Sequence, residues 1–149
     1  MPRHHWLQFL FQIDGIYLNK LGLYYENGTG TKKDLEKAFY WYQKAAENGS
    51  KAAQYNLGNC YKNRIGVEKD EVKAFEWYKK SAEQEDSNAQ NSLGLCYKNG
   101  AGTEKDSDIA FYWFQKAAGN GNKVAQYNLG VCYENGSIVE KDEVKIWMV

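Results

Sequence analysis

Apolar and polar residues alternate along this chain with the period of an α-helix. Within residues 51–63 and 35–47, the apolar side chains recur at steps of three or four positions, so each set lies on one face of a helix. The two sets are Ala53, Leu57, Cys60 and Tyr61, and Ala38, Trp41, Tyr42 and Ala45. No stretch shows the two-residue alternation of a half-buried strand. The pattern predicts an all-α fold.

The helical pattern repeats every 36 residues. A Leu-Gly dipeptide marks each copy, and a Tyr, an Asn and a Lys-Asp pair follow it at fixed distances. The four dipeptides are Leu21-Gly22, Leu57-Gly58, Leu93-Gly94 and Leu129-Gly130. Equal spacing over four copies predicts a helix pair that is stacked several times. We name the helix with the Leu-Gly dipeptide helix A and the following one helix B.

Residues that favour helix N-termini precede both helices of each copy, because their side-chain oxygens accept hydrogen bonds from unpaired backbone N–H groups. The predicted caps are Asp14, Ser50, Asp86 and Asn122 for helix A, and Asp34, Asp70, Asp106 and Asp142 for helix B. Helix A is expected to end at Gly28, Gly100 and Gly136, since glycine adopts the left-handed conformation at low cost. Arg64 takes this place in the second copy, so we expect Asn63 to make the turn there and the loop to differ.

These signals divide the chain into repeats at 14–49, 50–85, 86–121 and 122–149, the last of them truncated. Residues 1–13 are expected to form a degenerate capping helix, because their apolar residues could shield the first helix A. The predicted fold is an α-solenoid of about four antiparallel helix pairs. Since the last helix B is incomplete, either the array continues or its apolar end self-associates with a second copy.

The composition narrows the function. Nineteen Lys and Arg residues balance nineteen Asp and Glu residues, which argues against electrostatic binding to nucleic acid or a membrane. No stretch reaches the roughly 18 apolar residues that a membrane span needs. The apolar run near the N-terminus lacks the small-residue cleavage site of a signal peptide, so a cytoplasmic location is expected.

The repeated residues resemble the Sel1-like repeat, which is related to the tetratricopeptide repeat. The second copy shows the pattern as Ala53-x-x-x-Leu57-Gly58-x-x-Tyr61, Gly66-Val67-x-Lys69-Asp70 and Lys73-Ala74-x-x-Trp77-Tyr78-x-Lys80-x-Ala82. The tetratricopeptide repeat itself has a 34-residue period and a proline near the end of each repeat. Here the period is 36 residues, no such proline occurs, and a glycine-containing loop joins the helices. The resemblance implies an interaction scaffold.

Residues suited to catalysis are scarce. The only histidines are His4 and His5, beside the N-terminus, which is a poor place to hold a nucleophile and its base. The three cysteines stand one repeat apart, at Cys60, Cys96 and Cys132, so they are expected to form a ladder of core thiols rather than disulfides or a zinc site. We expect no enzymatic activity, no metal and no cofactor.

The remaining candidate site is the surface of helix A, which in stacked helix pairs usually lines the concave side. Non-core positions form ladders across the repeats, and exposed tyrosines in them are typical of binding surfaces. The candidate partner-binding residues are Tyr55, Asn59, Lys62, Asn91, Leu95, Lys98, Tyr127, Val131 and Glu134. The alternative is ordinary helix surface or packing between repeats.

The sequence therefore predicts a non-catalytic scaffold or adaptor that binds a peptide or protein segment. One alternative is a regulatory fragment of a larger signalling protein such as a kinase, which the truncated fourth repeat favours. Another is a hydrolase of the secreted Sel1-like kind. The resemblance implies paired cysteines within each repeat for such an enzyme, and each copy here has at most one cysteine.

Overall fold

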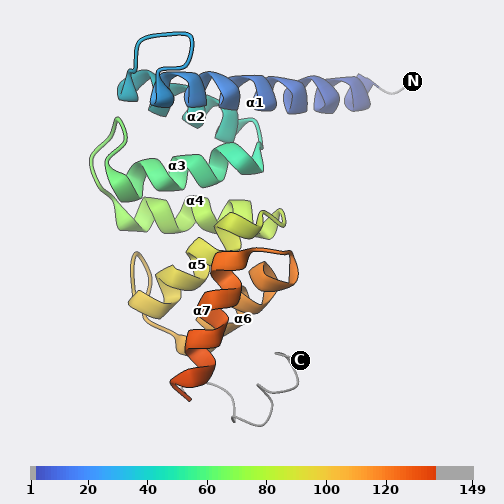
Figure 1. Cartoon of the computed structure of the whole chain (residues 1–149). Helices are drawn as coiled ribbons and strands as arrows, with labels where there is room; N and C mark the ends of the chain where they lie inside the picture. Colours follow the sequence, from blue (N-terminus) through green and yellow to red (C-terminus); the bar gives the residue numbers. More distant parts are fainter. Residues whose placement is uncertain (1–2, 137–149) are drawn as a thin grey trace.

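The computed structural model describes residues 3–136, with side chains from residue 14 onward. Over this range the chain forms seven α-helices and no strand, which confirms the predicted all-α fold (Figure 1). The helices are α1 (Arg3–Asn27), α2 (Leu35–Glu47), α3 (Lys51–Asn63), α4 (Glu71–Glu83), α5 (Ser87–Asn99), α6 (Ser107–Gly119) and α7 (Lys123–Glu134). The odd-numbered helices are the predicted helices A, and the even-numbered ones are helices B.

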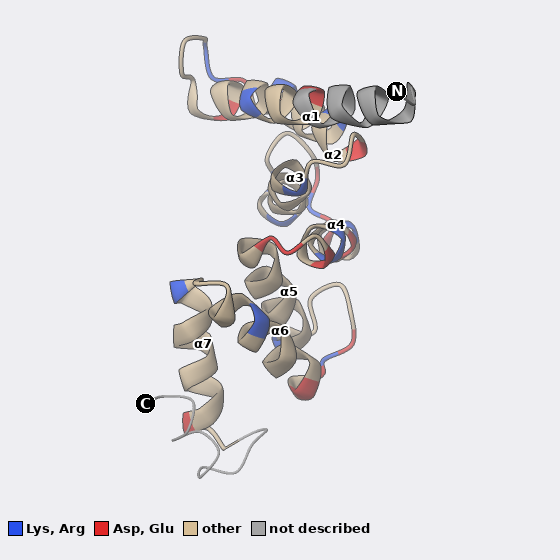
Figure 2. Ribbon diagram, turned by 90° about the vertical axis from the view of Figure 1, so that its right-hand side faces the viewer, with Lys and Arg blue, Asp and Glu red and all other residues tan. Residues whose placement is uncertain are grey.

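The helices stack in chain order, from α1 at one end to α7 at the other (Figure 1). Each helix packs mainly on its neighbours in the chain, most extensively within an A–B pair, so the arrangement is the predicted α-solenoid. A view turned by 90° shows acidic and basic positions interspersed along the ribbon (Figure 2). The end of the fourth repeat and its predicted self-association fall in residues 137–149, outside the described residues.

Helix N-caps form at the predicted places. The side chains of Ser50, Asp86 and Asn122 accept hydrogen bonds from backbone N–H groups three residues later, at 2.9–3.2 Å. Asp34, Asp70 and Asp106 do the same for the three helices B, at 3.0–3.1 Å. Asp142 lies outside the described residues. Each cap satisfies one of the donors that a helix start leaves unpaired, which fixes where each helix begins.

The predicted helix boundary at Asp14 is wrong, because α1 runs without a break from Arg3 to Asn27. The turns that separate the later repeats contain a residue with positive φ, as at Gly49 (89°) and Gly121 (87°). Ile13 is the residue one repeat before Gly49, and a β-branched side chain disfavours that conformation. The helix therefore continues where the other repeats turn. A separate shielding role for residues 1–13 stays a prediction.

The expectation for Arg64 is also wrong. Arg64 itself adopts the left-handed conformation, with φ of 60°, close to the 68° of Gly100. The backbone N–H of Ile65 donates to the carbonyl of Cys60 at 3.0 Å, as that of Ala101 does to Cys96 at 2.9 Å. The loop of the second repeat thus keeps the hydrogen bonds of the others. The conformation follows from the packing and the loop length rather than from the residue at the turn.

Close helix crossings define the core. Gly58 on α3 faces the ring of Tyr78 on α4, and Gly94 on α5 faces Phe114 on α6 in the same way. Tyr78 and Phe114 are buried, as are Leu57 and the other small or apolar residues between the two helix layers. A glycine without Cβ lets an aromatic ring lie directly on the helix backbone, so ring and glycine together set the distance between helices A and B.

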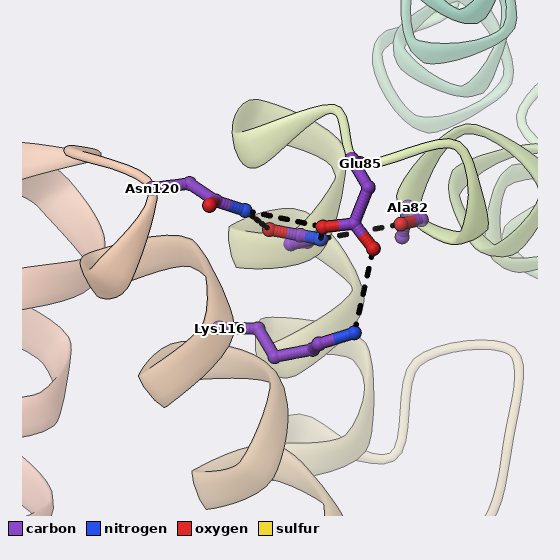
Figure 3. Close-up of polar contacts among 5 residues, drawn as sticks. Ala82, Glu85, Lys116 and Asn120 are labelled. Carbon is purple, nitrogen blue, oxygen red and sulfur yellow. Dashed lines mark hydrogen bonds and ion pairs between the residues drawn. The ribbon is translucent and has the colours of Figure 1, made fainter.

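Glu85 makes the turn between α4 and α5 in an unusual way. Its φ is 67°, in a place where the equivalent turns have Gly49 and Gly121. A non-glycine residue with positive φ is held there by its surroundings. The side chain of Glu85 provides these contacts, because its carboxylate reaches across to the next repeat (Figure 3).

The Glu85 carboxylate accepts hydrogen bonds from Nε2 of Gln90 at 3.3 Å and from Nδ2 of Asn120 at 3.4 Å. Nζ of Lys116 lies 3.5 Å away. The amide hydrogen bonds and then the charge of Lys116 lower the pKa of Glu85 below its usual value of 4.5. Gln90 is itself buried and donates to the carbonyl of Ala82 at 3.3 Å, so the cluster joins successive repeats (Figure 3).

Candidate protein-interaction surface

Two equivalent hollows lie one repeat apart on the stack. The first lies among α3, α4 and α5 and has a volume of about 200 Å³. The second lies among α5, α6 and α7 and has a volume of about 190 Å³. Each is bounded by the end of one helix A, the start of the following helix B and the next helix A. Asn99, at the end of α5, lines both hollows, so they are adjacent.

The floor of each hollow is apolar. In the first hollow it includes Ala74, Leu95 and Cys96, and in the second the equivalent residues are Ala110, Val131 and Cys132. Alanine at the start of helix B leaves space that a larger side chain would fill. The hollows can therefore accept an apolar side chain from a bound segment, in the way that interface pockets take anchor residues.

The rim of each hollow carries two lysines. Lys62 and Lys69 line the first hollow, and Lys98 and Lys105 line the second. In the first hollow Nζ of Lys69 lies 3.6 Å from Oε1 of Glu71, which partly compensates the positive charge. Glu71 is replaced by Ser107 in the second hollow, whose lining residues include no carboxylate. The two rims therefore differ in net charge although their shapes correspond.

The lysines on one helix A affect the pKa of the thiols on the next helix A, across each hollow. Burial raises the pKa of the Cys96 thiol to about 11. The charge of Lys62 on the neighbouring helix A opposes that rise, and the charge of Glu71 adds to it. Lys98 opposes the raised pKa of Cys132 in the same way. Each lysine on one helix A is thus electrostatically coupled to the floor contributed by the next helix A. A carboxylate entering the hollow would experience the same positive charge.

Four of the predicted partner-binding residues meet in these hollows. Lys62 and Leu95 line the first, and Lys98 and Val131 line the second. Tyr127 and Glu134 lie exposed on α7, with 72% of Tyr127 accessible. The structure brings Lys62 and Leu95 together in one hollow and Lys98 and Val131 in the other, whereas Tyr127 and Glu134 line neither.

Three other predicted residues are occupied by contacts between helices. The ring of Tyr55 packs on Tyr78, with 6.0 Å between centroids. The hydroxyl of Tyr78 donates to Oδ1 of Asn59 at 2.6 Å. Asn91 is 8% exposed, and its Oδ1 accepts a hydrogen bond from Nδ2 of Asn128 at 2.9 Å. These residues hold the stack together and offer little free surface.

The sequence did not single out the second lysine of each rim. Lys69 and Lys105 belong to the repeated Lys-Asp pair, which was used only to mark the repeat. Asn63 and Asn99, which end α3 and α5 beside the lysines, belong to the recurring Asn position that likewise marks the repeat. Their recurrence one repeat apart was visible, but recurrence alone does not separate a binding residue from one that builds the fold.

The three cysteines are buried, as predicted for core thiols, and Cys60 and Cys96 form no disulfide. Burial raises the pKa of the Cys60 thiol to about 12, so this thiol is protonated at neutral pH and is a poor nucleophile. In the described part of the chain, no three His, Cys, Asp or Glu side chains gather as a metal site would require. No helix described here has the length and apolarity to cross a bilayer. The side chains of His4 and His5 lie outside the described residues.

Two solved structures share this arrangement at 38% sequence identity. A Sel1 repeat protein from Oxalobacter formigenes superposes with a TM-score of 0.79 over 85% of this chain and 52% of its own. The protective antigen c5321 of uropathogenic Escherichia coli, which displays an SLR fold, gives 0.80 over 82% of this chain and 26% of its own. Helicobacter pylori cysteine rich protein B matches with a TM-score of 0.65 and 28% identity, over 76% of this chain and 90% of that one.

Sequence comparison agrees with the structural match. The Sel1-like repeat-containing protein L21 of Acanthamoeba polyphaga mimivirus is 47% identical over 45 residues, which are 30% of this chain and 8% of the viral protein. This chain thus spans a small part of that relative and about half of the Oxalobacter chain. The family model of the Sel1 repeat matches four successive segments, at 16–50, 51–86, 87–122 and 123–145. With its 36-residue helix pairs stacked in register, the chain belongs to the Sel1 repeat family.

Proposed function

We propose that this protein is a non-catalytic scaffold that binds an extended peptide or protein segment along the helix A face. Sel1 repeat proteins are generally scaffolds for protein interactions. The observation that carries the proposal is the pair of equivalent hollows, each with an apolar floor and a polar rim. Equivalent sites in successive repeats suit a ligand whose own residues recur along an extended backbone.

The chemistry of the described residues supports a binding role rather than catalysis. Burial raises the pKa of all three thiols, whereas a catalytic cysteine needs a lowered pKa. Besides lysines, amides and apolar side chains, the hollows are lined by Glu71, Tyr78, Ser92 and Ser107, and no histidine that could serve as a general base is among the lining residues. A cytoplasmic location remains part of this proposal, and Cys60 and Cys96, which form no disulfide, support it.

A blocking variant tests the proposal. Asn99 lines both hollows and is exposed at the end of α5, so Asn99→Trp should obstruct both without entering the core. Glu83→Trp, at the exposed end of α4, is the matched control. Peptides selected from a displayed random library on the unmodified protein should lose binding to Asn99→Trp and keep it with Glu83→Trp.

Tyr127→Ala gives a second measurement. Because Tyr127 is largely exposed, its removal should leave the circular dichroism spectrum and melting temperature unchanged while weakening a peptide that reaches α7. The proposal fails if no peptide is enriched from the library. It also fails if the enriched peptides bind Asn99→Trp as well as they bind the unmodified protein.

A further inference from the structure

We infer that the bound segment is acidic. Its carboxylate side chains stand about three residues apart in its sequence and pair with the two lysine rims. This inference rests on the proposed function, because it specifies the chemistry of the ligand for the same hollows. Four lysines converge there from two loops and two helix ends: Lys62, Lys69, Lys98 and Lys105. Among the lining residues only Glu71 carries a negative charge.

The positive charge is local. The whole chain carries no formal net charge, so an excess of lysine at this site is not a consequence of composition. Along the helix A ladder, Lys62 and Lys98 occupy the two middle repeats, whereas Glu26 and Glu134 occupy the equivalent places in the first and fourth. The basic zone thus extends over two adjacent hollows and ends at an acidic position on either side.

The acidic residues next to the rim lysines in the sequence do not line the hollows. Asp70 and Asp106 follow the rim lysines, and their side chains accept backbone hydrogen bonds from Lys73 and Ile109 as helix caps. Glu68 and Glu104 precede the lysines and are exposed, outside the residues that line the hollows. The second rim, where Ser107 replaces Glu71, keeps two lysines without a lining carboxylate, so it is the stronger anion site of the two.

The geometry sets the spacing of the acidic residues. Helices A of successive repeats are in contact, since Asn128 on α7 donates to Asn91 on α5 at 2.9 Å. Packed helices lie roughly 8–10 Å apart, and an extended chain advances about 3.3 Å per residue. A segment that crosses from one hollow to the next therefore places residues about three positions apart over successive rims. Asn63 and Asn99 beside the lysines can donate further hydrogen bonds to a carboxylate. The apolar floor, with Leu95 and Val131, accepts an intervening apolar side chain.

Fluorescence polarisation with three labelled peptides tests this inference. The peptides have the same length and the same Ala and Leu residues, and carry Glu, Gln or Lys at every third position. We expect the Glu peptide to bind at least about tenfold more tightly than the Gln peptide at low salt, because several partly desolvated ion pairs add to its binding. The Lys peptide should not bind, and added salt should weaken the Glu peptide.

Charge-reversal variants test whether the rim lysines cause the preference for the Glu peptide. Lys98→Glu together with Lys105→Glu should weaken the Glu peptide by about tenfold or more, and Ser107→Glu should weaken it in the same direction. Lys79→Glu is the matched control, since Lys79 is exposed on α4 and lines neither hollow. Circular dichroism of each variant checks that the helices are intact.

The outcomes separate this inference from the proposed function. The inference is overturned if the Gln peptide binds as tightly as the Glu peptide, or if Lys79→Glu weakens binding as much as the reversal at Lys98 and Lys105. If neutral peptides from the library bind and Asn99→Trp removes that binding, the function stands and the acidic ligand does not. If no library peptide and no designed peptide binds, both the proposed function and the acidic ligand are refuted.

Discussion

The pairing of glycine with an aromatic ring gives a sharp test of how the repeats pack. A Cβ built at Gly58 would lie 2.6 Å from Cε1 and 2.7 Å from Cδ1 of Tyr78. Gly130 occupies the equivalent place in α7, and within the described part of the chain no atom lies within 4 Å of a Cβ built there. The substitutions Gly58→Ala and Gly130→Ala therefore add the same methyl group to the same repeat position in two different environments.

The two substitutions should change the free energy of unfolding in opposite directions. Alanine is favoured over glycine inside a helix by about 1 kcal/mol, and both variants gain this term. Overpacking a core costs about 1–3 kcal/mol. Tyr78 cannot easily yield, because its side chain is 1% exposed and its hydroxyl is bonded to Asn59 at 2.6 Å. Because the added Cβ would lie well inside contact distance of the ring, we expect an overpacking cost of about 2–3 kcal/mol. Gly58→Ala should therefore lower the free energy of unfolding by about 1–2 kcal/mol, and Gly130→Ala should raise it by up to about 1 kcal/mol.

Thermal and urea denaturation, followed by circular dichroism at the helical band, measures both variants against the unmodified chain. For a chain of this size, 1 kcal/mol corresponds to about 2–4 °C in melting temperature. Gly94→Ala, which meets Phe114 at 2.6 Å, should behave like Gly58→Ala. A Gly58→Ala protein that melts at or above the unmodified temperature would refute the close approach of ring and backbone.

Three further predictions concern the core, the turn cluster and the thiols. Leu93 is fully buried, so Leu93→Ala should cost about 2–5 kcal/mol in denaturant titration, and a loss well below that would contradict a packed core. The pKa of Glu85 is lowered in the folded state, so its stabilising contribution is present above the usual carboxyl value of 4.5 and is lost as the pH falls below it. Melting temperatures of Glu85→Gln should therefore depend less on pH below 4.5 than those of the unmodified chain, and identical profiles would remove the carboxylate cluster as the cause. Because burial raises the thiol pKa of Cys60 to about 12, maleimide should label it only after urea unfolds the protein, and rapid labelling of the native protein would show an accessible thiol.

Most of the helices could be predicted from the sequence, because their starts depend on interactions between residues close together in the chain. An N-cap such as Asp70 needs only the backbone N–H of Lys73, three residues away, so its effect is contained in a short segment. The Asp14 boundary failed because a cap residue alone does not end the preceding helix. The chain must also turn there, and the residues around Ile13 do not provide the left-handed conformation that Gly49 and Gly121 provide.

The candidate surface could be predicted only partly from the sequence. Helical spacing placed Lys62, Leu95, Lys98 and Val131 on one side of the helices A, and the hollows contain all four. The same spacing placed Asn59 and Asn91 there, although hydrogen bonds from Tyr78 and Asn128 occupy them. Periodicity specifies a face of one helix and does not specify which polar groups another helix reaches.

The repeat, the helix pairs and nearly all helix starts follow from the sequence, since they depend on spacing and on hydrogen bonds between residues three or four positions apart. The free side chains, the positions of the two hollows and the positive φ of Arg64 and Glu85 depend on how the repeats pack. Those features depend on contacts between repeats, as between Asn91 and Asn128 or Lys116 and Glu85. Such contacts are fixed by how closely the helices cross, which is a property of the stacked array.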